Sequence, residues 1–435
     1  MRVYVETYGC QMNVADSDLM RAVMTKAGYG PADGPEDADV ILVNTCAVRE
    51  HAEERVFGRL TQLLSFKNRR PDVLLGVTGC MAEHLKERIL DRAPFIDLVV
   101  GPDAYRRLPD IVREAGYGDP RVDVRLDKDE VYEGLSRAPA AGGITGFVTV
   151  QRGCDKFCTF CVVPYTRGRE RGVSPREVLR QVREMAEAGY REVTLLGQTV
   201  NSYRYEDATF GDLLRLVADV DGIERVRFTS PYPVDFDDPL IDVIASVPEV
   251  MPYLHLPAQT GSDAVLDRMR RGHSVGEFRA LADRLRDRIE GLALSTDILV
   301  GFSGETDEDF DATVELMREI RFDFAFMFKY SERDLAKAAK ALPDDVSEEL
   351  NGARLRQVIE LQTQISREMF DAKIGADVEV LVLGTAKKDP ADLTGRSRDF
   401  KTTVLRGAAA RFSPGDIVPA TVTSSTGHTL IAQVR

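Results

Sequence analysis

The sequence predicts an α/β protein in three parts: an N-terminal doubly wound parallel-sheet domain, a central partial (β/α)6 barrel and a small C-terminal antiparallel β-barrel. Apolar runs of strand length alternate with helical patterns from Arg2 to Tyr330, which is typical of parallel sheets buried on both faces. From residue 372 onward, short strand patterns are punctuated by Gly and Pro. The 435 residues suffice for about three domains.

The N-terminal domain, predicted over residues 1–117, contains three strand patterns that each end in a cysteine and precede a helical pattern (2–10, 38–46 and 72–80). Carboxyl ends of parallel strands meet at one edge of a sheet, so we expect Cys10, Cys46 and Cys80 to converge. One such cysteine would be an ordinary small hydrophobic residue. Three in equivalent positions favour a three-ligand iron–sulfur cluster.

A polar stretch over 118–143, ending Ala-Pro-Ala-Ala-Gly-Gly, predicts a linker. The central domain follows over 144–371, with six strand candidates separated by helical patterns (147–151, 192–198, 225–230, 253–258, 292–302 and 324–330). One such helix is expected from Ser174 to Gly189, with a capping Ser and a Pro at its first position. Six units are too few to close an eight-fold barrel, so we expect an open barrel with its site at the strand carboxyl ends.

Directly after the first of these strands comes Gly-Cys-Asp-Lys-Phe-Cys-Thr-Phe-Cys, with Cys154, Cys158 and Cys161. Three thiolates on a short loop can hold three irons of a 4Fe-4S cube. The fourth iron would stay open to chelate a small molecule through amine and carboxylate groups. A zinc knuckle or a redox dithiol is the alternative, but structural zinc usually needs a second Cys or His pair, and the sequence has none nearby.

Four polar residues fall at or near the ends of other barrel strands: Gln198, Asn201, Gln259 and Asp297. They are candidate cofactor contacts, because a nucleoside with an amino-acid tail needs a few placed hydrogen-bonding groups. Each could equally cap a helix or satisfy a backbone group. His255 has no metal-ligand spacing and is expected to be a strand or loop residue.

A long helical pattern over 346–373 leads into the C-terminal domain, predicted over 372–435, with five short strand patterns (378–383, 392–395, 401–405, 414–423 and 429–434). This segment has nine Lys or Arg against six Asp or Glu, a net +3, which leaves −17 for the rest of the chain. Its first half carries basic residues that could grip a phosphate backbone (Lys387, Lys388, Arg396, Arg398 and Lys401). A purely structural cap is the alternative.

The overall charge of −14 argues against a uniformly basic DNA-coating protein, although it leaves room for a local nucleic-acid site. No segment approaches a membrane span, and the N-terminus lacks the apolar stretch of a signal peptide. We therefore expect a cytoplasmic protein with reduced thiols, without a membrane partner, and a monomer.

Several motifs together resemble the radical S-adenosylmethionine methylthiotransferase family across essentially the whole chain (6–13, 44–49, 78–80, 152–168, 255–257 and 326–333). The C-terminal segment is similar to the TRAM module that binds tRNA in this family. The resemblance implies that Cys154, Cys158 and Cys161 hold the 4Fe-4S cluster that binds and reductively cleaves S-adenosylmethionine. It implies an auxiliary 4Fe-4S cluster on the other three cysteines.

The implied reaction converts N6-dimethylallyladenosine at position 37 of the tRNA anticodon loop to its 2-methylthio derivative. One S-adenosylmethionine would methylate a sulfur on the auxiliary cluster, and a second would give a 5'-deoxyadenosyl radical that takes hydrogen from C2. Since C2 of a purine offers no acidic proton, the hard chemistry must come from cofactors. A reductant protein such as flavodoxin or ferredoxin is implied; the sulfur donor stays open.

Two loops depart from the family pattern, at Ser303 and at Asp334-Leu335-Ala336. Related enzymes acting on threonylcarbamoyl-adenosine in tRNA, or on an aspartate of a ribosomal protein, are the nearest alternatives. A non-catalytic iron–sulfur protein that binds RNA is the alternative of a different class.

Overall fold

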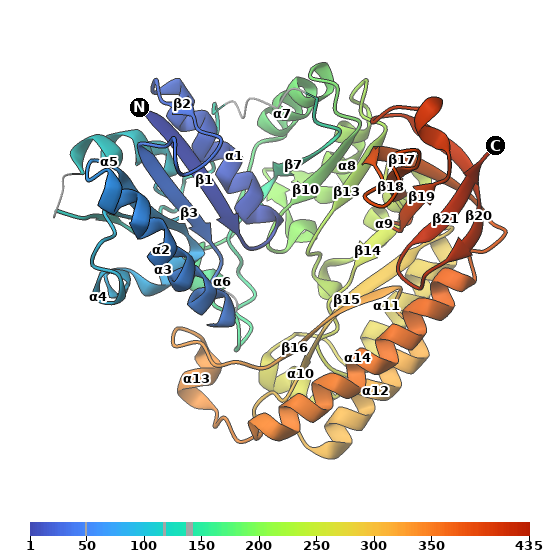
Figure 1. Cartoon of the computed structure of the whole chain (residues 1–435). Helices are drawn as coiled ribbons and strands as arrows, with labels where there is room; N and C mark the ends of the chain where they lie inside the picture. The colour runs from blue at the N-terminus through green and yellow to red at the C-terminus, as the bar shows by residue number, and fades with distance from the viewer. Residues whose placement is uncertain (48–49, 116–118, 136–141) are drawn as a thin grey trace.

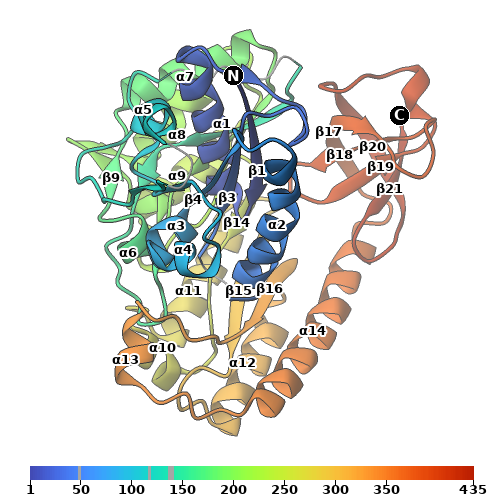
Figure 2. The same cartoon turned by 60° about the vertical axis from the view of Figure 1, so that its left-hand side comes forward.

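The computed structural model describes residues 1–47, 50–115, 119–135 and 142–435. The chain forms a parallel sheet at its N-terminus, an open barrel of parallel strands in the middle and a small closed barrel at its C-terminus, as the sequence predicts (Figure 1). Helix α14 (Glu348–Asp371) runs along the central domain as an arm to the small barrel (Figure 2). Among the described residues, no helix is both long and apolar enough to cross a bilayer.

The N-terminal sheet has six parallel strands in the order β2-β1-β3-β4-β5-β6: β1 (Arg2–Tyr8), β2 (Gly30–Pro31), β3 (Val40–Thr45), β4 (Leu74–Gly79), β5 (Leu98–Val100) and β6 (Arg121–Asp123). Its helices are α1 (Gln11–Lys26), α2 (Glu50–Arg69), α3 (Cys80–Leu85), α4 (Arg88–Arg92), η1 (Tyr105–Arg107) and α5 (Leu108–Glu114). Val40 and Leu42 pack into the core beneath α1 and α5, whereas Ile41 and Val43 pack into the core beneath α2 and α3. The sheet is therefore covered on both faces, which explains the continuous apolar runs.

The sheet extends into the stretch that composition marks as a linker, because β6 pairs in parallel with β5. The predicted domain boundary at 117 and the predicted flexible run 138–141 fall outside the described residues, as do Val48 and Arg49 of the second cysteine motif.

The central domain has six parallel strands: β7 (Thr145–Thr149), β10 (Glu192–Leu196), β13 (Arg225–Phe228), β14 (Tyr253–His255), β15 (Ala293–Val300) and β16 (Phe324–Lys329). A bridge between Val226 and Val250 links the two three-stranded halves. The covering helices are α7 (Pro175–Glu187), α8 (Phe210–Ala218), α9 (Asp238–Ser246), α10 (Asp263–Met269), α11 (Val275–Arg288) and α12 (Asp307–Ile320). All six predicted strands are confirmed, and Ser174 caps α7 as predicted.

Shorter elements decorate this barrel: β8 (Gln151–Arg152), α6 (Val163–Thr166), β9 (Arg171–Gly172), η2 (Val200–Ser202), β11 (Arg204–Tyr205), β12 (Ala208–Thr209), η3 (Pro233–Asp235) and α13 (Lys337–Ala341). The antiparallel pair β8–β9 brackets the loop that carries the second cysteine triplet.

The C-terminal barrel closes in the order β17-β18-β19-β21-β20: β17 (Asp377–Thr385), β18 (Leu393–Ser397), β19 (Thr402–Leu405), β20 (Ile417–Ser425) and β21 (Leu430–Val434), with η4 (Ala408–Ala410) between β19 and β20. Its strand pairs are antiparallel except β19–β21, which is parallel. Apolar side chains fill its interior, so it has a core of its own.

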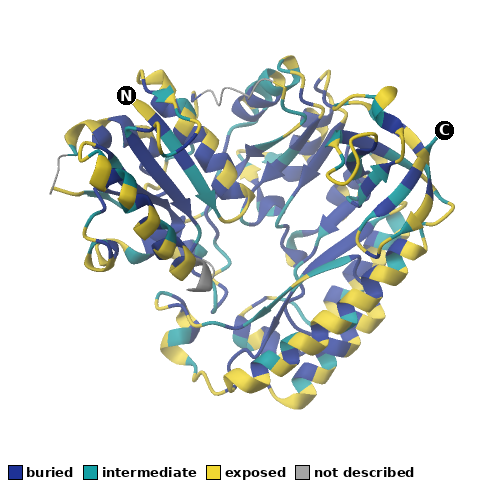
Figure 3. Cartoon of the chain, viewed as in Figure 1, coloured by how far each residue is buried: buried dark blue, intermediate teal, exposed yellow. Residues whose placement is uncertain are grey.

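This small barrel docks against the amino ends of the central strands. Arg225 and Arg227 of β13 donate to backbone carbonyls of residues 396–398, and Lys401 forms buried ion pairs with Asp323 and Asp399. Figure 3 shows buried residues along the strands of all three parts, mixed with intermediate and exposed residues in the small barrel, whereas the outer face of α14 is largely exposed. The ion pairs fix the small barrel to the end opposite the cysteine loop.

Candidate active site

The loop with Cys154, Cys158 and Cys161 follows β8 at the carboxyl end of the barrel, as predicted. The Cys154 amide donates to the Gly168 carbonyl at 3.1 Å, and the Cys161 amide donates to the Cys158 carbonyl at 3.0 Å. Thr159 bonds the carbonyls of residues 268 and 269 through its hydroxyl and its amide. The loop is therefore held to both of its flanks. Its three thiols lie close enough that negative charge on Cys158 or Cys154 would raise the pKa of Cys161 further.

Buried thiols in this loop need a positive partner to ionise. Burial raises the pKa of Cys154 to about 11 and that of Cys161 to about 12. Donors to the sulfurs are in place, since Arg271 Nη1 lies 3.3 Å from Cys158 Sγ and the Val163 amide lies 3.5 Å from Cys161 Sγ. Metal binding here would release thiol protons, so the site suits an iron cluster held by thiolates.

The three N-terminal cysteines come from neighbouring strands. Cys10 follows β1, Cys46 follows β3, and Cys80 begins α3 directly after β4. The chain reverses its direction of travel across the sheet between β1 and β3, and ligands gather at such switch points. The predicted convergence is confirmed: the Cys46 thiol hydrogen-bonds Cys10 and lowers its pKa to about 6, and the charges of Cys10 and Cys80 interact.

Two glycines let these loops approach closely. Gly79, with φ of +90°, precedes Cys80, and a Cβ there would lie 2.4 Å from Asn44 Oδ1 and 2.6 Å from the Thr45 carbonyl oxygen. A Cβ on Gly9 would lie 2.8 Å from the Cβ of Cys46. The Gly-Cys pairs at these strand ends are thus required by packing as well as by backbone conformation.

A buried amide clamp joins the first two cysteine loops. Asn13 Nδ2 donates to Asn44 Oδ1 and to the Thr45 carbonyl, both at 3.2 Å. Asn44 Nδ2 donates to the Asn13 carbonyl at 2.7 Å, and Asn13 Oδ1 accepts from the Cys10 amide at 3.3 Å. The clamp fixes the spacing of Cys10 and Cys46 before any cofactor binds.

A buried ion network connects the N-terminal cysteines to the central domain. Asp16 of α1 pairs with Arg152 at 2.7 Å and with Arg167 at 2.8 Å. Burial alone would raise the pKa of Asp16, but the guanidiniums of Arg167 and Arg152 outweigh it and hold that pKa below its usual range. Arg167 Nε also donates to Cys80 Sγ at 3.1 Å. Burial raises the pKa of the Cys80 thiol, and Arg167 offsets part of that rise.

The loop after β16 covers the same cysteines. Arg333 donates to the Ala47 carbonyl, next to Cys46, and pairs with Glu53 at 2.8 Å. Leu335 and Ala336, in one of the loops that depart from the family pattern, pack with Cys80 and Val162. Asp334 forms an exposed pair with Arg88 at 2.8 Å, and Ser303, the other departure, is buried.

Both triplets suit a cluster with three protein ligands. In the described residues no three His, Cys, Asp or Glu side chains converge as the ligands of a single metal ion do. A cube that takes one thiolate per iron does not require that convergence. Each group has three thiols, and in each group one sulfur accepts a hydrogen bond from an arginine. Cys10 and Cys161 are not fully buried. These features fit a cube with three protein ligands and one iron open to a further ligand.

The four predicted cofactor contacts have different surroundings. Gln198, just beyond β10, has a buried Oε1 without a hydrogen-bond partner, which suits a ligand contact. Asn201 instead bonds the amide and carbonyl of Tyr232, so it stabilises the backbone. Gln259, with φ of +72°, continues the strand ladder beside β15 through its backbone. Asp297 lies on β15 with Oδ2 3.3 Å from His255 Nε2. His255 is thus a strand residue, as predicted.

Sequence reasoning missed the arginines that contact the sulfurs, Arg167 and Arg271, and the carboxylate of Asp16. Arg167 stands in the basic run Arg-Gly-Arg-Glu-Arg six residues after the last cysteine, which is the signal that could have found it. Asp16 and Arg271 stand in ordinary helix and loop patterns that carry no such signal.

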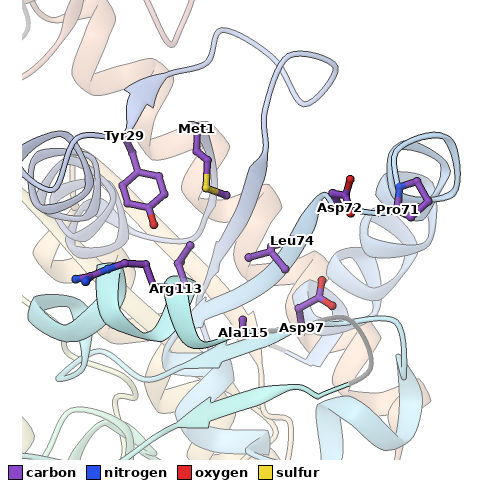
Figure 4. A pocket seen from close by; sticks show the side chains of 9 residues that line it. Met1, Tyr29, Pro71, Asp72, Leu74, Asp97, Arg113 and Ala115 are labelled. Carbon is purple, nitrogen blue, oxygen red and sulfur yellow. The ribbon is translucent and has the colours of Figure 1, made fainter.

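A pocket elsewhere on the chain does not belong to this site. It lies at the amino ends of the N-terminal strands, whereas the cysteines follow their carboxyl ends. Figure 4 shows the pocket, which is lined by Met1, Tyr29, Pro71, Asp72, Leu74, Asp97, Val112, Arg113 and Ala115. Asp97 is already engaged by Lys67 and by the Leu75 amide. No cysteine lines this pocket.

Comparison with known proteins decides the family. Residues 2–101 match an uncharacterized protein family, UPF0004, residues 148–317 match the radical SAM superfamily, and residues 371–434 match the TRAM domain. A tRNA-2-methylthio-N(6)-dimethylallyladenosine synthase from Chlorobium luteolum is 45% identical over 99% of this chain and 96% of its own length. The chain belongs to the tRNA-2-methylthio-N(6)-dimethylallyladenosine synthase family. A second member, from Porphyromonas gingivalis, is 44% identical over 93% of this chain and 89% of its own length.

The match confirms the radical S-adenosylmethionine methylthiotransferase resemblance and supports an iron–sulfur cluster and S-adenosylmethionine as cofactors of this synthase-family chain. Solved structures agree on the fold. The radical S-adenosylmethionine methyltransferase TsrM from Kitasatospora setae superposes with a TM-score of 0.55 at 14% identity, covering 75% of this chain and 73% of its own. The cobalamin-dependent S-adenosylmethionine radical enzyme OxsB gives 0.54 at 12%, covering 83% and 56%.

Proposed function

We propose that this chain is a radical S-adenosylmethionine methylthiotransferase that converts N6-dimethylallyladenosine at position 37 of the tRNA anticodon loop to its 2-methylthio derivative. It would use two 4Fe-4S clusters and two S-adenosylmethionine molecules. The observation that carries the proposal is the presence of two separate cysteine triplets, each drawn together by the fold, in a chain of this family.

The two triplets would have different roles. Cys154, Cys158 and Cys161 would hold the cluster that binds S-adenosylmethionine, and the unpaired amide oxygen of Gln198, just beyond β10, would be available to that cofactor. Cys10, Cys46 and Cys80 would hold the auxiliary cluster. When bound, these groups supply one-electron, methyl-transfer and sulfur chemistry that side chains cannot supply. The protein would bind both clusters through these thiols, and the clamp at Asn13 and Asn44 would orient the auxiliary cluster.

The inner wall of the barrel offers a place for the substrate base. Asp297 and Phe326 are paired neighbours on β15 and β16, so both side chains point the same way, and the His255 ring meets the Phe326 ring edge-on at 5.7 Å. Phe326 is 53% exposed, unusual for a strand aromatic. Stacking of an unpaired base on an aromatic side chain contributes about 1–3 kcal/mol of binding free energy for each base.

Phe326→Ala should therefore weaken binding of the modified tRNA about tenfold. Leu216→Ala, at an exposed site on α8, should leave the binding unchanged.

The small barrel would supply phosphate contacts. Lys387 and Lys388 are exposed on the loop after β17 and available to a phosphate backbone. Lys401, also predicted for this role, cannot serve, because it is fully buried between Asp323 and Asp399. Deleting the whole barrel would expose Arg225 and Arg227, which could then bind RNA themselves. A double Lys387→Ala, Lys388→Ala variant avoids this and tests the loop alone. Its affinity for tRNA should fall, and its salt dependence should weaken by about two phosphate contacts; unchanged affinity would remove this loop from the RNA surface.

Reductive cleavage of S-adenosylmethionine needs an electron donor, and the donor, the location and the oligomeric state complete the proposal. We infer a cytoplasmic monomer without a membrane partner that receives electrons from a small reductant protein of the flavodoxin or ferredoxin type.

Anaerobic reconstitution tests the reaction. The reconstituted protein is given reductant, S-adenosylmethionine and tRNA that carries dimethylallyl-adenosine, and the digested RNA is analysed by nucleoside mass spectrometry. The 2-methylthio nucleoside is the expected product. Formation of 5'-deoxyadenosine without that nucleoside would move the substrate to threonylcarbamoyl-adenosine or a ribosomal-protein aspartate. Failure to cleave S-adenosylmethionine at all would favour a non-catalytic iron–sulfur protein that binds RNA.

A further inference from the structure

Two buried arginines each bond a cysteine sulfur and keep an unused donor: Arg271 at the loop triplet and Arg167 at the N-terminal cysteines. Arg167 is the one that links the N-terminal cysteines to the central domain. The residue is 3% exposed, its Nε donates to Cys80 Sγ at 3.1 Å, and its Nη2 donates to Asp16 at 2.8 Å. Its Nη1 is buried and has no hydrogen-bond partner in the protein. A buried charged donor without a partner is unfavourable because it has lost its hydration, so a partner is expected.

The surroundings of Arg167 indicate what that partner is. Its Nε bonds the sulfur of Cys80, a candidate cluster ligand, and its Nη2 bonds the carboxylate of Asp16. Cys10, a second candidate ligand, lies at the end of a strand in the same sheet. Asp16 is already shared between Arg152 and Arg167, which holds the guanidinium in place beside the sulfurs.

We propose that Arg167 is a positioning residue of the auxiliary cluster: Nε bonds the Cys80 thiolate, and Nη1 donates to a second sulfur acceptor of the bound cluster. That acceptor is either an inorganic sulfide or the sulfur carried on the open iron. The inference rests on the auxiliary cluster of the proposed function. Hydrogen bonds to cluster sulfurs stabilise the reduced, more negative state and raise the reduction potential.

A second consequence concerns the domains. Arg167 follows α6 in the central domain, whereas Cys80 begins α3 in the N-terminal domain. Part of the environment of the auxiliary cluster therefore comes from the domain that holds the other cluster, and a change in how the two domains dock would change the auxiliary potential.

The test isolates the auxiliary cluster in the full-length chain by replacing Cys154, Cys158 and Cys161 with Ala. Iron content, the electron paramagnetic resonance spectrum and the midpoint potential are then measured with and without Arg167→Gln. We expect a potential lower by at least the equivalent of a tenfold change in the reduced-to-oxidised ratio, about 59 mV for one electron. Arg167→Lys keeps the charge but not the planar fork, and should restore only part of the shift.

Arg152→Gln is the matched control. Arg152 is as buried as Arg167 and bonds the other oxygen of Asp16, whereas Arg167 also bonds the Cys80 sulfur. A clearly smaller shift in this variant supports the proposal. An equal shift in Arg152→Gln, or an unchanged potential in Arg167→Gln, overturns it, since the effect would then come from charge or packing alone.

Added methanethiol, as a probe of the open iron, distinguishes the two acceptors. Tenfold weaker binding of the probe in Arg167→Gln, seen as a shifted titration of the spectrum, would assign Nη1 to the added sulfur. Unchanged probe binding together with a lowered potential would assign Nη1 to a bridging sulfide.

If the parent variant, without Cys154, Cys158 and Cys161, binds no 4Fe-4S cluster, the two-cluster assignment of the proposed function fails. If it binds a cluster whose potential is the same with and without Arg167→Gln, only the present inference is contradicted.

Discussion

The two cysteine triplets reach similar surroundings by different routes. Cys154, Cys158 and Cys161 lie within one loop, so their proximity is built into the chain, and hydrogen bonds to neighbouring loops only adjust it. Cys10, Cys46 and Cys80 meet only because β1, β3 and β4 are adjacent in the sheet. In each group one sulfur accepts a hydrogen bond from an arginine of the central domain: Cys158 from Arg271, and Cys80 from Arg167. A local site can thus tolerate changes in the rest of the fold that a convergent site cannot.

The largest expected effect separates the roles of the two triplets. Cys158→Ala should abolish both reductive cleavage of S-adenosylmethionine and methylthiolation, because it removes a ligand of the cleaving cluster. Cys10→Ala should abolish methylthiolation while leaving cleavage largely intact. Mass spectrometry of 5'-deoxyadenosine and of the modified nucleoside checks both. Equal loss of cleavage in the two variants would contradict the division.

The second effect tests the dependence on convergence. Gly79→Ala should displace Cys80, because the new Cβ would collide with Asn44 and the Thr45 carbonyl. Iron in the N-terminal site should fall to a small fraction while the other cluster stays loaded. Gly28→Ala is the control, with a similar φ of +92° and open space around it, and should cost only about 1 kcal/mol of stability. Similar iron loss in both variants would show that backbone strain, not close approach, matters.

Arg271 allows a test of whether the loop triplet, Cys154, Cys158 and Cys161, functions separately from the N-terminal cysteines. Arg271→Met removes the donor at 3.3 Å from Cys158 Sγ, and hydrogen bonds from charged donors are worth about 1.5–3 kcal/mol. Cleavage of S-adenosylmethionine should slow roughly tenfold, which corresponds to about 1.4 kcal/mol. The spectrum of the N-terminal cluster should not change. A change in both spectra would mean that the two sites are less separate than their contacts indicate.

The smallest effect on the clusters is expected from a buried ion network that has no cysteine among its members. Burial alone would raise the pKa of Asp399, but the ammoniums of Lys401 and Lys373 outweigh it and hold that pKa at about 2. The stabilisation, about 2 kcal/mol, is present above the ordinary carboxyl pKa near 4 and is lost as pH falls through about 2. Asp399→Asn should therefore lower the melting temperature at pH 7 but not at pH 2. Both clusters should load normally; cluster loss would tie this interface to the sulfur sites.

Much of the fold follows from local pattern. Apolar runs of strand length predict β1, β3, β4 and all six barrel strands, because sheets that are covered on both faces favour such runs. Strand β6 was hidden in a polar stretch, since a three-residue edge strand needs little apolar surface. Lys401 was assigned to RNA because a charge count cannot distinguish a solvated lysine from one buried between two carboxylates. Asn201 looked like a cofactor contact, and its partner is the Tyr232 backbone, thirty-one residues away.

By itself, the sequence determined the cysteine loop, the order of strands and helices and the membership of each cysteine in a triplet, because these depend on spacing and periodicity along the chain. Only the tertiary structure decided that Asp16 lies between Arg152 and Arg167, that Arg167 reaches Cys80 and that the small barrel occupies the amino end of the central strands. Contacts between residues 87 to 171 positions apart leave no periodic trace in the sequence. They appear only when packing brings three domains against one another.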